Sequence, residues 1–102
     1  MKDLQNETMN VAQSKTATND SITVGATSTA VLELNESRDY VIMTNDSDET
    51  IYLALGATAV MNKGIRLNAS GGSYELTPLD DYKGAISAIC SSGSKNLCVS
   101  YY

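Results

Sequence analysis

Apolar and polar residues alternate along most of this chain with a period of two, which is the pattern of β-strands that bury one side. The alternation begins near Ser21 and recurs in short runs to the end of the sequence. One run, 39–44, is apolar at consecutive positions, which predicts a central strand. We expect strands within residues 22–24, 30–34, 39–44, 51–55, 65–67, 74–76, 84–90 and 97–102.

Turn-forming residues separate the predicted strands. Clusters of Asn, Asp, Ser and Gly recur every ~8–12 residues, a spacing that is typical of a β-sandwich or barrel. The only proline, Pro78, follows a predicted strand, where its missing N–H interrupts no pairing. We therefore predict an all-β fold, a small antiparallel sandwich or barrel of roughly seven or eight strands with a jelly-roll-like order.

The alternation also predicts which side chains of a strand lie on the same face. In the second run we expect Ala30, Leu32 and Leu34 to share one face. Val31 and Glu33 are then expected on the opposite face.

Residues 1–19 differ from the rest of the chain because they are rich in Asn, Gln, Thr and Ser and show no strand pattern. This stretch is either a frayed terminus or an arm that orders on a partner. We divide the chain into a polar N-terminal arm, residues 1–19, and a β-sandwich domain, residues 20–102. If the arm binds a partner, we expect Leu4, Met9 and Val11 to anchor it.

Length and charge restrict the classes of partner. A chain of 102 residues is long enough for one modest core and too short for two. The net charge is −5 and the seven Lys and Arg residues are scattered, which argues against nucleic acid and against an anionic membrane surface. No apolar run approaches the ~18–20 residues of a spanning helix, and the first residues lack the apolar core of a signal peptide. We expect neither a membrane span nor ordinary secretion.

The absence of histidine restricts the chemistry of the chain. It removes the commonest general base and rules out a Ser-His-Asp or Cys-His arrangement within the chain. Gly56 and the pair at 71–72 follow no strand-to-helix pattern, so they predict turns rather than a phosphate loop. We predict no catalytic residue, no cofactor and no metal site. Paired carboxylates brought together from distant strands stay open as a glycosidase-like arrangement.

The acidic segment 45–49 invites a calcium interpretation, because oxygen ligands at alternate positions are what a calcium loop supplies. A loop beginning at Asp46 would need glycine at its sixth position, where this chain has Ile51. We therefore favour a solvated turn between strands. The pair Asp80 and Asp81 is interpreted in the same way.

The two cysteines flank the last predicted turn. We expect the runs 84–90 and 97–102 to pair as a hairpin, and with its turn near Ser94 the positions of Cys90 and Cys98 would face each other. A cross-strand disulfide is one interpretation, although direct opposition strains the bond. The alternative, which we favour, is two reduced thiols that act as small core residues in a protein made in the cytoplasm.

Four segments carry motifs that recur together elsewhere. They read Ile-Tyr-Leu-Ala-Leu-Gly-Ala-Thr-Ala at 51–59, Lys-Gly-Ile-Arg-Leu at 63–67, Gly-Gly-Ser-Tyr-Glu at 71–75 and Gly-Ala-Ile-Ser-Ala-Ile at 84–89. In these motifs and in the Asn-rich turn that precedes them, the chain resembles small virion proteins of tailed bacteriophages. The resemblance extends over residues 21–102 and consists of strand and turn patterns.

The resemblance implies a structural role, as a capsid decoration (head-stabilising) protein or as the base of a head fibre. Such proteins are commonly compact β-sandwiches, often trimeric, on the outer capsid surface, and their terminal arms frequently reach across neighbouring capsid subunits. It implies a virion location after synthesis in the host cytoplasm. The implied partner is the major capsid protein or another virion protein, in a homo-oligomer that includes the trimer. No enzymatic activity and no catalytic residue are implied.

Two other functions remain as alternatives. One is a tail-fibre or baseplate module that binds a host-surface glycan, for which tyrosines would have to line a groove because the chain has no tryptophan. The other is a metal-dependent or acid/base hydrolase, which the missing histidine makes the weakest. The tyrosines available to a glycan site are Tyr40, Tyr52, Tyr74, Tyr82, Tyr101 and Tyr102.

Overall fold

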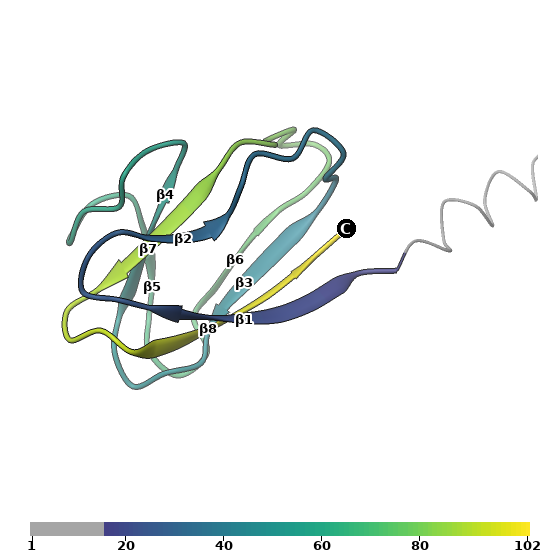
Figure 1. Ribbon diagram of the computed structural model, residues 1–102. Helices are drawn as coiled ribbons and strands as arrows, with labels where there is room; N and C mark the ends of the chain where they lie inside the picture. The colour runs from purple at the N-terminus through teal and green to yellow at the C-terminus, as the bar shows by residue number, and fades with distance from the viewer. Residues whose placement is uncertain (1–15) are drawn as a thin grey trace, which may run out of the picture.

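The computed structural model describes residues 16–102, which form two four-stranded antiparallel sheets packed face to face (Figure 1). The first sheet has the strand order β1-β8-β3-β6, and the second has the order β2-β7-β4-β5. This architecture confirms the all-β sandwich expected from the sequence. The strands are β1 (Thr18–Val24), β2 (Thr29–Leu32), β3 (Val41–Asn45), β4 (Ile51–Leu55), β5 (Ile65–Leu67), β6 (Ser73–Leu76), β7 (Ile86–Cys90) and β8 (Lys95–Tyr101).

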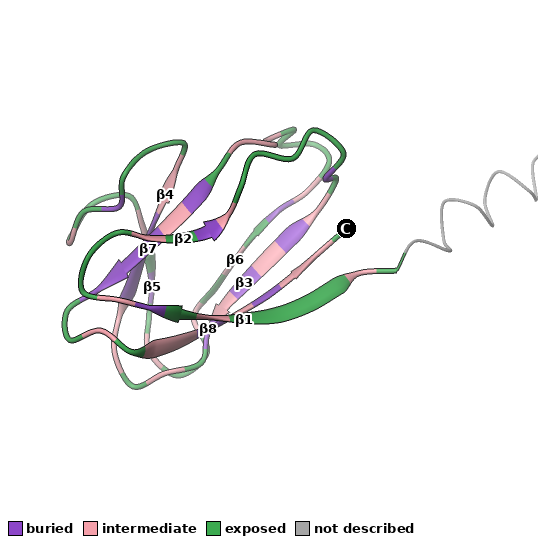
Figure 2. Ribbon diagram, viewed as in Figure 1, coloured by how far each residue is buried: buried purple, intermediate pink, exposed green. Residues whose placement is uncertain are grey.

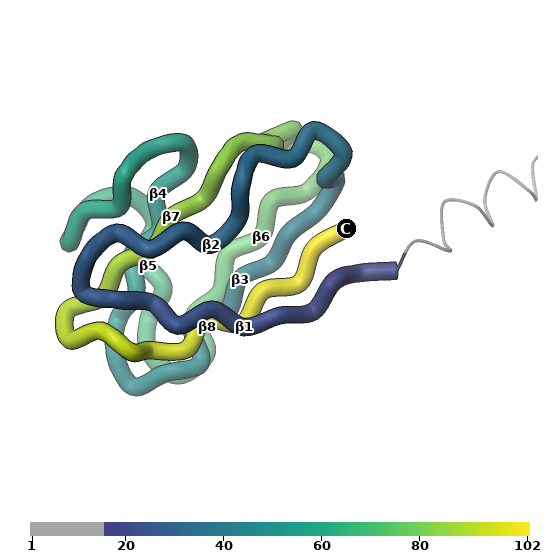
Figure 3. The backbone as a smooth tube through the Cα atoms, in the orientation of Figure 1, coloured from purple at the N-terminus to yellow at the C-terminus, as the bar shows by residue number. Residues whose placement is uncertain are grey.

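The chain crosses between the sheets at almost every connection. Only β4 and β5 are consecutive strands in the same sheet, and every other connection passes from one sheet to the other. Eight strands in this order form a jelly roll, which is built from two Greek keys. One result is that β1 and β8, far apart in the sequence, run side by side over their whole length (Figure 3).

The core lies between the two sheets. On β3, Val41, Met43 and Asn45 are buried, whereas the intervening residues are only partly covered. The strand lies between β8 and β6, so the prediction of a central strand at 39–44 is confirmed. Figure 2 shows the alternation of buried and partly buried residues along β3, and the buried cluster draws on strands of both sheets. Each fully buried aliphatic side chain stabilises the fold by about 1.5–3 kcal/mol.

The predicted hairpin of the last two strands is wrong. Strand β7 pairs with β2 and β4 in the second sheet, and β8 pairs with β1 and β3 in the first. Residues 91–94 therefore carry the chain across the core from one sheet to the other. A four-residue connection suits a hairpin or a crossing equally well, because both only need the chain to reverse, and the alternation of the flanking strands is the same in either case.

The prediction that Ala30, Leu32 and Leu34 share one face of the strand is also wrong. Val31 is buried, Ala30 is exposed, and Leu34 lies beyond the end of the strand with 64% of its surface exposed. The pairing of β2 with β7 shifts register between Ala30 and Leu32. Such an irregularity adds one residue to the strand, which sends the following side chains to the opposite face.

The outer faces of the two sheets differ. Residues 56–64, between β4 and β5, fold over the second sheet and bury Tyr52 and Ile89 against Ala59 in a small second cluster. Gly64 permits this path, because it has a φ of 86° and an added Cβ would lie 2.3 Å from the carbonyl oxygen of Leu53. The outer face of the first sheet carries mainly small polar side chains, among them Ser21, Thr23, Thr44, Ser73 and Ser100.

The loops gather at two ends of the sandwich. The end that we call the Arg38 end is formed by residues 33–40 and 77–85 together with Tyr102 (Figure 1). The opposite end, called the Asn45 end, is formed by the other sheet-crossing connections. The residues of the Asn45 end are 25–28, 46–50, 68–72 and 91–94.

Strand β1 begins at Thr18, two residues before the predicted domain boundary, so the sandwich includes Thr18 and Asn19. Within residues 16–102 no helix has the length and apolarity needed to cross a membrane.

Candidate functional site

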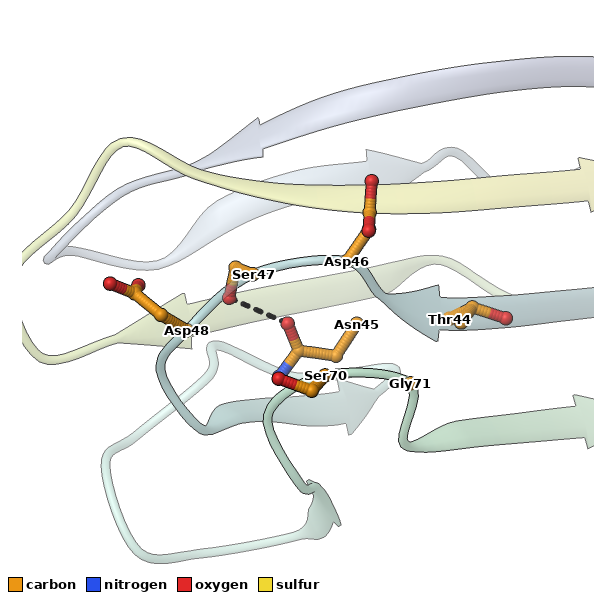
Figure 4. Close-up of a pocket in the computed structure, with 7 residues that line it drawn as sticks. All are labelled: Thr44, Asn45, Asp46, Ser47, Asp48, Ser70 and Gly71. Atoms are coloured by element: carbon orange, nitrogen blue, oxygen red, sulfur yellow. Dashed lines mark hydrogen bonds between the residues drawn. The ribbon is translucent and has the colours of Figure 1, made fainter.

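A shallow polar pocket lies at the Asn45 end, between the β3–β4 connection and the β5–β6 connection (Figure 4). At its base the side chain of Asn45 is fully buried. Its Nδ2 donates to the carbonyl oxygens of Glu49 at 2.7 Å and Leu67 at 3.0 Å, and its Oδ1 accepts from the Ser47 hydroxyl at 2.6 Å. Asn45 therefore ties the two connections together, and its polar atoms are occupied by the protein itself.

The acidic side chains around this pocket are directed to protein donors. Glu49 accepts from the Ser92 backbone N–H at 2.8 Å and from the Ser92 hydroxyl, and Asp48 pairs with Lys95 at 2.7 Å. Among residues 16–102 no three acidic, Cys or His side chains gather in a metal-binding arrangement. The segment 45–49 thus forms a hydrogen-bonded turn between strands, as its composition indicates.

These contacts lower two carboxyl pKa values. The hydrogen bond and the charge of Lys95 lower the pKa of Asp48, and the hydrogen bonds from Ser92 lower the pKa of Glu49. A carboxyl whose pKa is lower in the folded state stabilises the fold above its unfolded pKa, which is about 4. That contribution is lost as the pH falls through the folded pKa.

We therefore expect the melting temperature to fall as the pH is lowered below about 5, with part of the fall due to Glu49. A thermal melting series from neutral pH to about pH 3 on Glu49→Gln should show a shallower acid dependence than the parent chain. The control is Glu36→Gln, because Glu36 makes no hydrogen bond to any residue that the structure describes. If the melting temperature of Glu49→Gln falls with pH as steeply as that of the parent chain, Glu49 does not contribute to the acid dependence.

The Arg38 end is organised by one buried cation. Arg38 is 2% exposed, and its guanidinium donates to the carbonyl oxygens of Gly84 at 2.8 Å, Tyr82 at 3.4 Å and Glu33 at 3.4 Å. The Lys83 ammonium in turn donates to the Arg38 carbonyl oxygen. These bonds fasten the β2–β3 connection to the β6–β7 connection.

Arg38 has no carboxylate partner within the described part of the chain, and its Nε atom makes no hydrogen bond there. Burial lowers the pKa of the guanidinium from its usual value. Such a group is held by carbonyl dipoles rather than by an opposite charge, which makes it a structural clamp. It also lines a groove between β1 and β2 whose walls include Val31, Leu32 and Tyr101.

Both cysteines are free thiols, as favoured from the sequence, but only Cys90 is a core residue, because Cys98 is partly exposed. Cys90 is fully buried between the sheets, where its thiol lies 3.4 Å from the carbonyl oxygen of Val24. Burial raises the pKa of Cys90, which keeps the thiol protonated and unreactive. Cys98 lies on β8 in the other sheet, paired across from Ser21 and Thr44.

The tyrosines pack and hydrogen-bond within the fold. Tyr40 stacks on Tyr102 with ring centroids 5.3 Å apart, so each ring covers one face of the other. Of the six, only Tyr101 lines either of the two hollows described above. Three hydroxyls are used within the fold, since Tyr40 donates to Glu75, Tyr52 to Asn62 and Tyr82 to the carbonyl oxygen of Ala85.

The predicted anchor residues Leu4, Met9 and Val11 lie outside the described residues. Arg38 is not predicted from the sequence, because its role depends on carbonyl oxygens more than 40 residues away. Asn45 is predicted only as part of a turn, although the apolar run that leads into this residue is the signal that it ends a buried strand.

No protein-family model, curated protein or solved structure matches this chain. Its function is therefore inferred from its fold and its surface.

Proposed function

We propose that this chain is a non-enzymatic structural protein of a tailed-bacteriophage virion, which decorates or stabilises the capsid surface through its β-sandwich and its N-terminal segment. The proposed partner is the major capsid protein or another virion protein. The proposed oligomer places several copies on a repetitive surface, where multivalent attachment raises the overall affinity.

The jelly-roll order of the eight strands is the observation that supports this proposal most. This fold is used by viral capsid and lectin domains and by cupins. Histidine is the commonest protein ligand of transition metals, and this chain contains none. Lectin function needs a groove with open hydrogen-bonding groups, whereas three of the six tyrosine hydroxyls and the polar atoms of the Asn45 side chain are bonded to the protein itself. An assembly role requires no such site.

The test is co-sedimentation of the purified protein with phage capsids stripped of accessory proteins. We expect saturable binding with a fixed number of copies per capsid. A deletion of residues 1–15 leaves all of β1 in place, so it separates the contribution of the segment from that of the fold. We expect this deletion to abolish capsid binding while the melting temperature stays that of the full chain.

Full decoration by the shortened protein would contradict the role of the N-terminal segment. The absence of any binding by the full chain would contradict the capsid proposal as a whole. A glycan array then tests the remaining alternative, a module that binds a host-surface glycan.

A further inference from the structure

Large apolar side chains are exposed mainly at the Arg38 end. Four are exposed within residues 16–102, and three of them, Leu34 (64% exposed), Leu79 (95%) and Tyr102 (39%), belong to this end. The fourth, Val60, lies on the loop that covers the second sheet. One exposed leucine is ordinary on a protein surface, but three large apolar residues at one end indicate an interaction site.

The three side chains are carried by segments that are bonded to one another. The backbone N–H of Asn35 donates to the carbonyl oxygen of Lys83 at 2.9 Å, which joins the loop of Leu34 to the loop of Leu79. The backbone N–H of Asp39 donates to the carbonyl oxygen of Tyr102 at 2.7 Å. Together with the Arg38 clamp, these bonds make the end one connected surface.

Leu79 is held in a rigid turn. The backbone N–H of Asp80 donates to the carbonyl oxygen of Thr77 at 3.0 Å, and the Asp80 carboxylate accepts from the Thr77 backbone N–H at 2.7 Å. Pro78 fixes the backbone just before Leu79. A backbone turn that is fixed before binding loses less conformational entropy on binding, so this turn is suited to present the exposed Leu79 side chain as an anchor.

The charge around the anchor is negative. Residues 33–40 and 77–85 contain five acidic residues, Glu33, Glu36, Asp39, Asp80 and Asp81, against the two basic residues Arg38 and Lys83. Arg38 is buried, and Lys83 lies 3.6 Å from Asp39 and 3.9 Å from Asp81. A second copy of this acidic surface would be repelled, whereas a surface with basic residues around an apolar pocket would be complementary.

We infer that the Arg38 end is the surface that docks on the virion, with Leu79 inserted into an apolar pocket of a virion protein and basic residues around that pocket facing Glu33 and Glu36. This inference rests on the proposed function and adds to it the end of the sandwich that makes contact and the chemistry of the partner. The Asn45 end then faces away from the contact.

The test is the binding of purified full-length variants to stripped capsids at several salt concentrations. Leu79→Ser leaves Thr77, Pro78 and Asp80 in place, and its exposed side chain contributes little to folding. We expect it to raise the Kd about tenfold or more, because a buried leucine is lost from the contact. The matched control is Val60→Ser, another exposed apolar side chain, which we expect to bind within about twofold of the parent chain.

The charge of the partner is tested by Glu36→Lys, with Asp46→Lys at the Asn45 end as its control. Both changes alter the net charge equally. We expect Glu36→Lys, but not Asp46→Lys, to weaken binding several-fold at about 50 mM NaCl. The difference in Kd between Glu36→Lys and the parent chain should shrink at about 500 mM NaCl, because salt screens exposed charges.

Binding by Leu79→Ser equal to that of the parent chain, or an equal loss in Val60→Ser, would overturn the inference while leaving the capsid proposal standing. Tighter binding by Glu36→Lys would overturn the prediction that basic residues surround the pocket of the partner. A parent chain that binds no capsid at any salt concentration would overturn both proposals together.

Discussion

Asn45→Ala is expected to lower the free energy of unfolding by about 3 kcal/mol, because it leaves several buried polar groups without partners. The substitution removes the donors to the carbonyl oxygens of Glu49 and Leu67 and the acceptor of the Ser47 hydroxyl. An unsatisfied buried group costs about 1–3 kcal/mol, and water reaching the shallow pocket offsets part of the sum. The melting temperature should fall by roughly 10–20 °C.

Urea unfolding, monitored by circular dichroism, measures this loss of unfolding free energy. The control is Asn68→Ala, because the Asn68 side chain is on an exposed residue and accepts a hydrogen bond only from Arg66 within the described residues. We expect the control to change stability by less than about 0.5 kcal/mol. Equal losses in the two variants would mean that the buried network of Asn45 does not hold the two connections together.

Arg38→Ala is expected to cost about 2–3 kcal/mol and to loosen the whole Arg38 end. Two effects oppose each other. Removing a buried charge that has no carboxylate partner relieves a desolvation penalty, whereas the carbonyl oxygens of Gly84, Tyr82 and Glu33 lose a charged donor and the packed side-chain stem is lost. The loss of these hydrogen bonds and of the packing outweighs the relieved desolvation penalty, because hydrogen bonds to a charged group are worth about 1.5–3 kcal/mol each.

Hydrogen exchange resolves this effect by region. In Arg38→Ala we expect faster exchange in residues 33–40 and 77–85 and little change in the Asn45 end. The control is Arg66→Ala, which removes the other arginine of the chain from an exposed site on β5. Uniform acceleration over all strands would show that Arg38 supports the sandwich as a whole rather than one end. Unchanged exchange in the two loops would contradict its role as a clamp.

The all-β fold and most strand positions could be predicted, because an antiparallel sandwich imposes a local period of two on each strand. Pairing partners could not be predicted in the same way. Whether residues 91–94 close a hairpin or cross the core depends on which strands pair with β7 and with β8. This pairing depends on all the strands of the two sheets and not on the local sequence. The exposed Ala30 and buried Val31 show the same limit, since a single irregularity reverses the pattern without a local signal.

The candidate surfaces were predictable only in part. The turn at 77–80 can be recognised from Pro78 and Asp80, but the exposure of Leu79 depends on how its loop meets the rest of the end. Arg38 and Asn45 have roles that rest on carbonyl oxygens of distant segments. Such roles are fixed by the three-dimensional arrangement, because every residue supplies a carbonyl and none of them marks its partner in the sequence.

The position of β8 between β1 and β3 has a consequence for how the protein is made. The last of the eight strands to leave the ribosome is an inner strand of the first sheet, so β1 has no neighbour until translation has passed Tyr101. During synthesis β1 therefore has no hydrogen-bonding partner, and the first sheet is complete only when β1 pairs with β8. Folds with such distant contacts form slowly, on a scale of about milliseconds to seconds. The polar composition of β1 helps to keep that unpaired strand soluble, since five of its seven residues are polar and only Ile22 and Val24 are apolar.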